Sequence, residues 1–228
     1  MWHLGLQQMV ENLVRDGVLE NLAFRAALLS IDRADFVPET LRARAYLNEA
    51  LPLGYGSTIS QPWTIAFMLN LLEPESGERI LDIGSGSGYQ TALLAYLVNQ
   101  GDGHHKGRVF GLELVPELAK QSLRNLAKYQ FVHHGVIEIH CLNAERGYLA
   151  GAPFDKIIAG ACLPAGRRAD QESVPVAWKE QLKLGGRIVV LVGKEIVRLT
   201  KIQPPDSPTP IFTEERFPGF SFVPFREE

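Results

Sequence analysis

The chain has 228 residues, 46% of them hydrophobic and 21% charged, and its formal net charge at pH 7 is −3. This length supports one large core, or one core with a small extension, and the slightly acidic balance argues against a general nucleic-acid binder. No apolar run reaches the ~18 residues of a membrane span, two cysteines make no disulfide framework, and the first residues lack a signal-peptide pattern. We therefore expect a cytoplasmic protein that has neither a membrane nor a nucleic acid as its partner.

The first 75 residues are predicted to form a helical cover. Apolar residues recur there at helical spacing in two stripes, Leu6, Met9, Val10, Leu13 and Val14, then Leu22, Ala26 and Leu29. Residues 51–62 are rich in Gly, Pro, Ser and Thr, which predicts a loop with a shape of its own. Another helix is expected over residues 64–72, ending before Glu73-Pro74.

Strands and helices are predicted to alternate over residues 76–228. The expected strands are 79–83, 108–112, 136–141, 156–160 and 187–192, followed by closing strands at 196–202, 212–217 and 220–225. The expected helices are 89–97, 116–127 and one around 176–183. This alternation predicts an α/β fold in which a mostly parallel sheet has helices on both faces, within a single domain of residues 1–228.

The stretch from Ile80 to Gly88 carries the strongest signal, because a strand ends in an acidic residue and then enters a glycine-rich turn before a helix. Backbone N–H groups at such a turn favour a nucleotide-like ligand. A dinucleotide pattern would place its third glycine where this chain has Tyr89, and the carboxylate of Asp82 would repel a pyrophosphate. The pattern fits S-adenosylmethionine, which has cationic groups and no phosphate; the alternative is an ordinary turn of an α/β protein.

Ligands of open parallel sheets lie beyond the carboxyl ends of the strands. Four segments should converge there: the turn after Ile83, Glu113, the turn at Asn143, and residues 159–164. Glu113 can accept hydrogen bonds from both hydroxyls of a ribose, because a carboxylate has two acceptor oxygens and no donor. The alternative is a surface glutamate at a strand end.

Several further segments together carry a family resemblance. The most specific is the loop from Leu51 to Pro62, which reads Leu-Pro-Leu-Gly-Tyr-Gly-Ser-Thr-Ile-Ser-Gln-Pro. The others are Phe36-Val37-Pro38, Ala45-Tyr46, the run from Leu81 to Ala92, the run from Leu182 to Arg187, and Phe222-Val223-Pro224-Phe225. These segments resemble the protein-L-isoaspartate (D-aspartate) O-methyltransferases. The resemblance spans nearly the whole chain and implies a Rossmann-like class I methyltransferase with a seven-stranded sheet.

The resemblance implies methyl transfer from S-adenosylmethionine to the free carboxylate of L-isoaspartyl and D-aspartyl residues in damaged proteins and peptides, which starts their repair and leaves S-adenosylhomocysteine. A carboxylate with a pKa near ~4 is already ionised at neutral pH, so no general base is required. Ser60 would then act by orienting the acceptor carboxylate. Two alternatives stay open: a methyltransferase with a different acceptor, and a cofactor-binding homologue without turnover.

The residues expected at the site follow from these motifs and from the resemblance. Those expected to bind the cofactor are Thr58, Ile59, Asp82, Gly84, Ser85, Gly86, Gly88, Glu113, Leu114, Asn143 and Ala144. Those expected to contact the substrate are Ser60, Gln61 and Cys162, with Ser60 as the catalytic residue.

Two segments depart from the family's pattern. Leu142-Asn143-Ala144 stands where the family commonly has Gly-Asp-Gly, so we expect an altered cofactor affinity, because Asn lacks the negative charge. Gly160-Ala161-Cys162-Leu163-Pro164 replaces an Ala-Ala-Ala-Pro-like loop, and a polar run follows at 167–173. These changes should bear on the substrate.

Other reactive side chains do not suggest a second chemistry. Adjacent histidines at 104–105 and 133–134 lack further ligands at a suitable spacing, so no metal is expected. Cys162 has no paired histidine and is expected to be a small buried thiol, while Arg167-Arg168 is expected to be a solvated charge pair. We expect a monomer.

Overall fold

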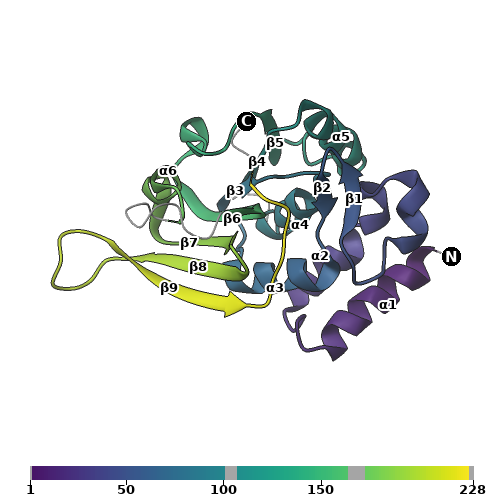
Figure 1. Cartoon of the computed structure of the whole chain (residues 1–228), viewed down its shortest axis with the longest axis horizontal. Helices are drawn as coiled ribbons and strands as arrows, with labels where there is room; N and C mark the ends of the chain where they lie inside the picture. Colours follow the sequence, from purple (N-terminus) through teal and green to yellow (C-terminus); the bar gives the residue numbers. More distant parts are fainter. Residues whose placement is uncertain (1, 101–106, 164–172, 226–228) are drawn as a thin grey trace.

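The computed structural model describes residues 2–100, 107–163 and 173–225, and seven of its strands form one sheet. The sheet order is β5-β4-β3-β6-β7-β8-β9 (Figure 1). Neighbours from β5 to β7 run parallel, and β8 and β9 are added antiparallel. The strands are β3 (Arg79–Ile83), β4 (Arg108–Glu113), β5 (Ile137–Cys141), β6 (Phe154–Leu163), β7 (Leu182–Val192), β8 (Glu195–Ile202) and β9 (Ile211–Pro218). The predicted α/β fold with a mostly parallel seven-stranded sheet is confirmed.

The amino-terminal cover is helical, as predicted. It consists of α1 (Trp2–Arg15), α2 (Leu22–Ser30), the 3-10 helices η1 (Arg33–Phe36) and η2 (Glu39–Arg44), and α3 (Pro62–Leu72). The Asn21 side chain caps α2 by accepting hydrogen bonds from the backbone N–H groups of Ala23 and Phe24. The remaining helices are α4 (Tyr89–Val98), α5 (Pro116–Leu126), the 3-10 helices η3 (Ala127–Tyr129) and η4 (Leu149–Gly151), and α6 (Val176–Glu180).

Alternating residues of each central strand point to two separate hydrophobic cores. On β3, Ile80 packs with the amino-terminal helices and α4, whereas Leu81 and Ile83 pack on the opposite face. That second face holds the buried Trp178 of α6. Both faces are therefore covered, but most of the helical mass lies on the face of Ile80.

The predicted loop at residues 51–62 is wrong in part, because it contains a β-hairpin. Strands β1 (Leu51–Gly54) and β2 (Ser57–Ile59) pair antiparallel as a separate two-stranded sheet. The turn between them holds three consecutive residues with positive φ, Gly54, Tyr55 and Gly56. The two glycines accept this conformation without a steric penalty and so allow a tight reversal.

The predicted strand at 220–225 is also wrong, since this segment forms one isolated parallel bridge, between Cys162 and Pro224. Pro224 lacks the N–H that a continuing ladder needs. The segment is held instead by two backbone hydrogen bonds, from Cys162 N to Val223 O and from Phe225 N to Cys162 O. It leaves β9 and runs back across the carboxyl end of β6, as the last yellow stretch of Figure 1 shows.

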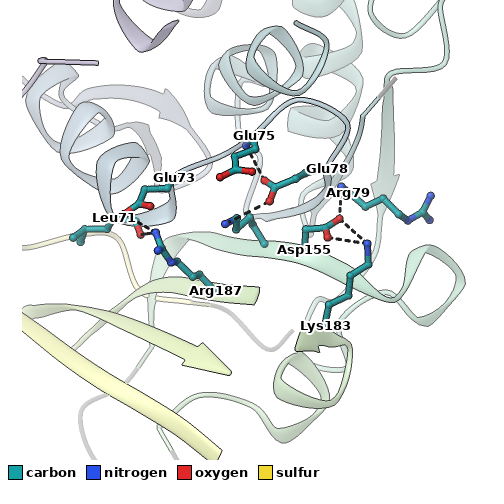
Figure 2. Close-up of polar contacts among 9 residues, drawn as sticks. Leu71, Glu73, Glu75, Glu78, Arg79, Asp155, Lys183 and Arg187 are labelled. Atoms are coloured by element: carbon teal, nitrogen blue, oxygen red, sulfur yellow. Dashed lines mark hydrogen bonds and ion pairs between the residues drawn. The ribbon is translucent and has the colours of Figure 1, made fainter. Parts of the chain in front are cut away.

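A network of ion pairs and hydrogen bonds joins residues at the amino ends of the central strands (Figure 2). The glycine turn lies at the other end of these strands, because it follows the carboxyl end of β3. The Asp155 carboxylate accepts hydrogen bonds from the backbone N–H of Arg79 and from the Lys183 ammonium, both at 2.8 Å. Nearby, the Lys156 ammonium lies 3.4 Å from the Glu78 carboxylate, and both side chains are largely buried. This network holds the start of β3 against the starts of β6 and β7.

None of the helices in the described part of the chain combines the length and apolar character that crossing a lipid bilayer requires.

Candidate active site

The glycine turn between β3 and α4 is fixed by the neighbouring strand β4. The backbone N–H groups of Gly84 and Ser85 both donate to the carbonyl of Leu112, at 2.8 and 3.0 Å. Gly88 ends the turn with φ +88°, and a Cβ there would lie 2.6 Å from the Ser122 hydroxyl oxygen. A glycine is therefore required at 88 for helix α4 to begin so close to α5.

The carboxylate of Glu113 at the end of β4 faces this turn. Its Oε2 accepts a hydrogen bond from Gly86 N at 2.8 Å, and its Oε1 accepts one from Val115 N at 2.9 Å. The side chain is only 6% exposed. Each oxygen keeps acceptor capacity beyond its one backbone donor, so the group is held in place and can still accept hydrogen bonds from a ligand's hydroxyls.

Asp82 is fully buried beneath the turn. It accepts hydrogen bonds from the Thr91 hydroxyl at 2.5 Å and from the Gln90 amide at 2.7 Å, both on α4. Burial is the main cause that raises the pKa of the Asp82 carboxyl to about 6, the Thr91 and Gln90 hydrogen bonds oppose the rise, and the charge of Glu113 adds to it. Asp82 is thus a negative charge behind the turn at neutral pH, sensitive to mild acid.

A cavity, here called the main cavity, opens at the carboxyl ends of β3, β4 and β6. Together with the open solvent at its mouth, it offers about 650 Å³ of space free of protein atoms. Its lining residues are Gly56, Ser57, Thr58, Ile83, Gly84, Gly86, Leu112, Glu113, Leu114, Val115, Leu142, Ala144, Gly160, Ala161, Val223, Pro224 and Phe225.

Two further hollows adjoin the main cavity along the β1–β2 hairpin. The inner hollow is lined by Thr58, Ile59, Ser60, Ile65, Gly84, Ser85, Gly86, Ser87, Tyr89, Gln90 and Gly160. The outer groove is lined by Ala50, Thr58, Ser60, Gln61, Thr64, Gly219, Phe220, Ser221 and Phe222. Thr58 borders all three spaces, and Ser60 borders the inner hollow and the outer groove. Residues 58–60 thus form a continuous wall that runs from the main cavity to the more exposed outer groove.

The structure brings together most of the residues predicted for the site. Thr58, Gly84, Gly86, Glu113, Leu114 and Ala144 line the main cavity, and Ile59, Ser60, Gln61 and Ser85 line the adjoining hollows. Asp82 and Gly88 lie directly behind the turn rather than on its surface.

Asn143 and Cys162 line none of these three spaces. Asn143 uses its side-chain oxygen to accept a hydrogen bond from Glu145 N at 2.7 Å. The Cys162 thiol lies 3.2 Å from the carbonyl oxygen of Gly193, and burial raises its pKa. Whether either residue contacts a ligand stays a prediction. The predicted residues His104, His105, Pro164, Arg167 and Arg168 lie outside the described residues.

Sequence reasoning did not assign several lining residues. The wall formed by Val223, Pro224 and Phe225 was expected to be a strand, and its place at the cavity depends on the tertiary hydrogen bonds to Cys162. Gly160 and Ala161 belong to the segment 159–164 that was expected to converge at the site, but neither was named as a ligand contact. Gly160 ends the predicted strand and Ala161 lies one residue beyond it, where the register shifts between Ala159 and Cys162. The apolar, uncharged character of both segments was the available signal.

The charged and polar groups at the three spaces fit a nucleoside with a cationic end. Neither Lys nor Arg occurs among their described lining residues, so no cation is placed there to bind a phosphate. The available charges are the carboxylates of Glu113 and, behind the turn, Asp82. The buried Ser85 hydroxyl, which has no partner among the described residues, adds an unused polar group. S-adenosylmethionine, with two ribose hydroxyls, an ammonium and a sulfonium, matches this set.

The described residues contain no group of three or more His, Cys, Asp or Glu side chains placed to hold a metal ion.

Comparison with known proteins identifies the family. A model of the protein-L-isoaspartate(D-aspartate) O-methyltransferase family matches residues 5–226. A protein-L-isoaspartate O-methyltransferase of Staphylothermus marinus is 36% identical over 192 residues, which cover 84% of this chain and 81% of that protein. Protein-L-isoaspartate O-methyltransferase 2 of Marinobacter nauticus is 41% identical over 189 residues, covering 82% of this chain and 75% of that protein.

Solved structures agree with the fold. A Plasmodium falciparum structure, assigned to protein-L-isoaspartate O-methyltransferase and holding S-adenosyl-L-homocysteine, superposes with a TM-score of 0.77 at 23% identity and covers 97% of this chain and 98% of its own. A second protein-L-isoaspartate O-methyltransferase structure gives a TM-score of 0.78 at 22% identity, covering 96% of this chain and 65% of its own. The predicted family is confirmed: this chain belongs to the protein-L-isoaspartate(D-aspartate) O-methyltransferase family.

Proposed function

We propose that this chain methylates the free carboxylate of L-isoaspartyl and D-aspartyl residues in damaged proteins, with S-adenosylmethionine as the methyl donor. The observation that carries the proposal is the shared wall of the β1–β2 hairpin. Thr58 borders both the main cavity and the outer groove, and Ser60 follows it two residues later between the inner hollow and that groove. A donor in the main cavity and an acceptor in the outer groove would meet at this wall.

The cofactor assignment uses the acids and the glycine turn. Glu113 would accept hydrogen bonds from the ribose hydroxyls, and the backbone of Gly84 and Gly86 would lie against the methionine portion. Asp82 would stabilise the ammonium by its charge, through the turn. Leu114 and Ala144 would contact the adenine, with Asn143 near its amino group. The S-adenosyl-L-homocysteine held by the Plasmodium falciparum relative supports this choice.

When bound, S-adenosylmethionine would supply a methyl group on a positively charged sulfur. An oxygen of the acceptor carboxylate would take this methyl group, and the electron pair of the broken carbon–sulfur bond would stay on sulfur. No residue has to remove a proton, because the acceptor is already ionised at neutral pH. The task of the chain is therefore alignment and exclusion of water.

Ser60 is the residue that we propose to align the acceptor. Its hydroxyl would donate a hydrogen bond to the acceptor carboxylate, and Gln61, which also lines the outer groove, would contact the neighbouring backbone of the substrate. The backbone of Thr58 and Ile59 would border the transferred methyl group. That the enzyme acts as a monomer stays a prediction.

The test is incubation with S-adenosylmethionine labelled in its methyl group, together with an isoaspartyl peptide or its aspartyl twin. We expect base-labile label on the isoaspartyl peptide alone, because a carboxyl methyl ester hydrolyses in base. Label on both peptides would indicate a less selective acceptor site. Label on neither peptide, with S-adenosylhomocysteine binding intact by calorimetry, would contradict the proposed reaction and favour a homologue without turnover.

A further inference from the structure

Arg33, the first residue of η1, is fully buried, with 0% of its surface exposed. Its guanidinium donates hydrogen bonds to three backbone carbonyls that lie far along the chain: Ala45 O at 2.5 Å, Glu49 O at 3.0 Å and Ser60 O at 3.0 Å. One side chain therefore connects η1 to the end of η2, to the segment before β1 and to the residue that borders the inner hollow.

A buried guanidinium is costly, and the cost shows in its titration. Burial is the main cause that lowers the pKa of Arg33, although the nearby Glu49 and Tyr89 oppose the shift. An apolar residue of similar volume would avoid that cost. What it could not supply is a planar set of donors able to hold three carbonyls at once.

Ser60 lies where the local structure leaves the chain without a ladder or a helix. Strand β2 ends at Ile59 and α3 begins at Pro62. The Ser60 carbonyl accepts the hydrogen bond from Arg33 Nη2. The position of the Ser60 backbone is thus held by a side chain 27 residues earlier.

The backbone around Arg33 is itself held by hydrogen bonds of the neighbouring residues. The Asp32 carboxylate accepts hydrogen bonds from Ala34 N and from the Tyr46 hydroxyl, both at 2.9 Å. The Tyr129 hydroxyl accepts one from Asp32 N at 2.9 Å and donates one to Asp35 at 2.6 Å. These bonds fix η1 from two sides, so the guanidinium is presented from a rigid support.

We propose that Arg33 is a positioning residue for methyl transfer, whose guanidinium fixes the Ser60 segment so that the Ser60 hydroxyl is aimed at the acceptor carboxylate. The inference rests on the proposed function. Arg33 lines none of the three spaces, so it would act through the Ser60 segment rather than by contact with a ligand.

The test is a double-mutant cycle between Arg33→Lys and Ser60→Ala. Lysine keeps the charge but has one donor nitrogen and cannot span the three carbonyls. We expect R33K to lower kcat by about 10-fold or more while the Kd for S-adenosylhomocysteine changes less than about threefold. In the S60A background, R33K should lower kcat by less than about threefold, because the two substitutions disrupt the same alignment of the acceptor carboxylate. Additive losses, or an equal loss of cofactor affinity, would overturn the proposal.

Amide hydrogen exchange supplies a readout that does not need activity. R33K should speed exchange in residues 57–65 and leave the glycine turn at 84–88 as protected as in the wild type. If the wild type methylates no isoaspartyl peptide, the proposed function fails and the catalytic inference with it, while exchange still decides whether Arg33 holds this segment. Unchanged exchange at 57–65 would show that it does not.

Two further variants separate positioning from general instability. Lys156→Met breaks an ion pair at the opposite edge of the sheet, so it should lower the melting temperature with kcat retained. If R33K does not fold, Tyr46→Phe removes only the hydrogen bond to Asp32 and leaves the guanidinium intact. Y46F should lower kcat by about two- to fivefold, an effect that disappears in the S60A background. A full, additive loss in Y46F would contradict the role of the anchor.

Discussion

The carboxylate of Glu113 accepts a hydrogen bond from the backbone N–H of Gly86 at 2.8 Å, across 27 residues of sequence. The contact joins the end of β4 to the middle of the glycine turn. It fixes the turn and the acid relative to each other before any ligand is bound, so the ribose of the proposed cofactor would meet acceptors already in position.

Glu113→Gln should therefore weaken cofactor binding strongly. The amide replaces one acceptor oxygen with an NH₂ donor, which faces either Gly86 N–H or Val115 N–H and cannot accept from the ribose. Loss of charge-assisted hydrogen bonds worth about 1.5–3 kcal/mol predicts a 10- to 100-fold increase in the Kd for S-adenosylhomocysteine by calorimetry. Glu117→Gln, an exposed change on the first turn of α5, is the matched control and should leave the Kd unchanged.

We expect Asp82 to make cofactor binding sensitive to mild acid. Its carboxyl has a pKa of about 6 in the folded chain because it is buried. If binding requires the ionised form, the apparent Kd for S-adenosylhomocysteine rises as pH falls through this value, by about fourfold at pH 5.5 and about tenfold at pH 5. Calorimetry between pH 8 and 5 measures the slope. Asp82→Asn should bind weakly at every pH, and an acid-dependent slope that persists in D82N would assign the titration to another group.

The raised pKa of Asp82 has the opposite pH dependence for folding: mild acid should weaken cofactor binding but favour the folded state. The folded carboxyl holds its proton up to about pH 6, whereas the unfolded one releases it near 3.8. Between these values the folded state binds more protons, so the contribution of Asp82 to stability falls as pH rises through this window. Urea unfolding of D82N beside the wild type should show the difference. A contribution that grows with pH across the window would contradict the assignment.

Ser60→Ala should separate alignment from cofactor binding. Ser60 borders the inner hollow and the outer groove but not the main cavity, so removal of its hydroxyl should affect the acceptor. We expect kcat with an isoaspartyl peptide to fall by about 10- to 100-fold and the cofactor Kd to stay within about threefold. Ser207→Ala, in the loop between β8 and β9, is the control and should keep both values. Equal losses in kcat and cofactor affinity would exclude an orienting role for Ser60.

Local patterns predicted the part of the site that is built from consecutive residues. The strand, glycine turn and helix around Asp82 follow from apolar spacing and turn chemistry within about 20 residues. The hairpin at 51–59 was missed because its strands are three and four residues long and contain Pro52 and Gly54, which resemble a loop. Pairing between two such short strands is decided by what they pack against.

Tertiary contacts decided the rest. Arg33 stands in a polar run, Asp32-Arg33-Ala34-Asp35, which is typical of a surface, and only the folded chain buries it against three distant carbonyls. The alternating aromatics at 220–225 resemble a strand, yet a strand requires a partner ladder, and this segment meets β6 at one bridge. The spacing of apolar residues indicates which side chains become buried, but it does not indicate which neighbouring segment buries them.

Gly88→Ala should destabilise the fold through a defined contact. The residue has φ +88°, and an added Cβ would lie 2.6 Å from the Ser122 hydroxyl oxygen and 3.2 Å from Leu126 Cγ. Backbone strain and overpacking together predict a loss of about 2–4 kcal/mol in the free energy of unfolding.

Gly185→Ala is the matched control for that prediction. Its φ is +78°, but nothing lies within 4 Å of an added Cβ, so it should lose only the strain of about 1 kcal/mol. Chemical denaturation of both variants isolates the contact as the difference. Equal losses in the two variants would show that α5 can move away from an added Cβ at residue 88 without an energetic cost, so that the close contact between α4 and α5 is unimportant for stability.

The ion pair between Lys156 and Glu78 should contribute to stability and not to the site. Lys156→Met leaves the Glu78 carboxylate without its ammonium partner in a place where burial already raises the pKa of that carboxyl. Breaking one side of a buried pair predicts a loss of about 3 kcal/mol in the free energy of unfolding.

The loss in Lys156→Met should also depend on pH. Because a raised pKa of the Glu78 carboxyl in the folded state lowers stability as pH rises above the pKa of the unfolded chain, the loss should be larger at pH 8 than at pH 5. Adding Glu78→Gln should restore most of the loss. Urea unfolding measures both effects, and an unchanged Kd for S-adenosylhomocysteine would separate this edge of the sheet from the glycine turn; a weakened Kd would show that the two edges are linked.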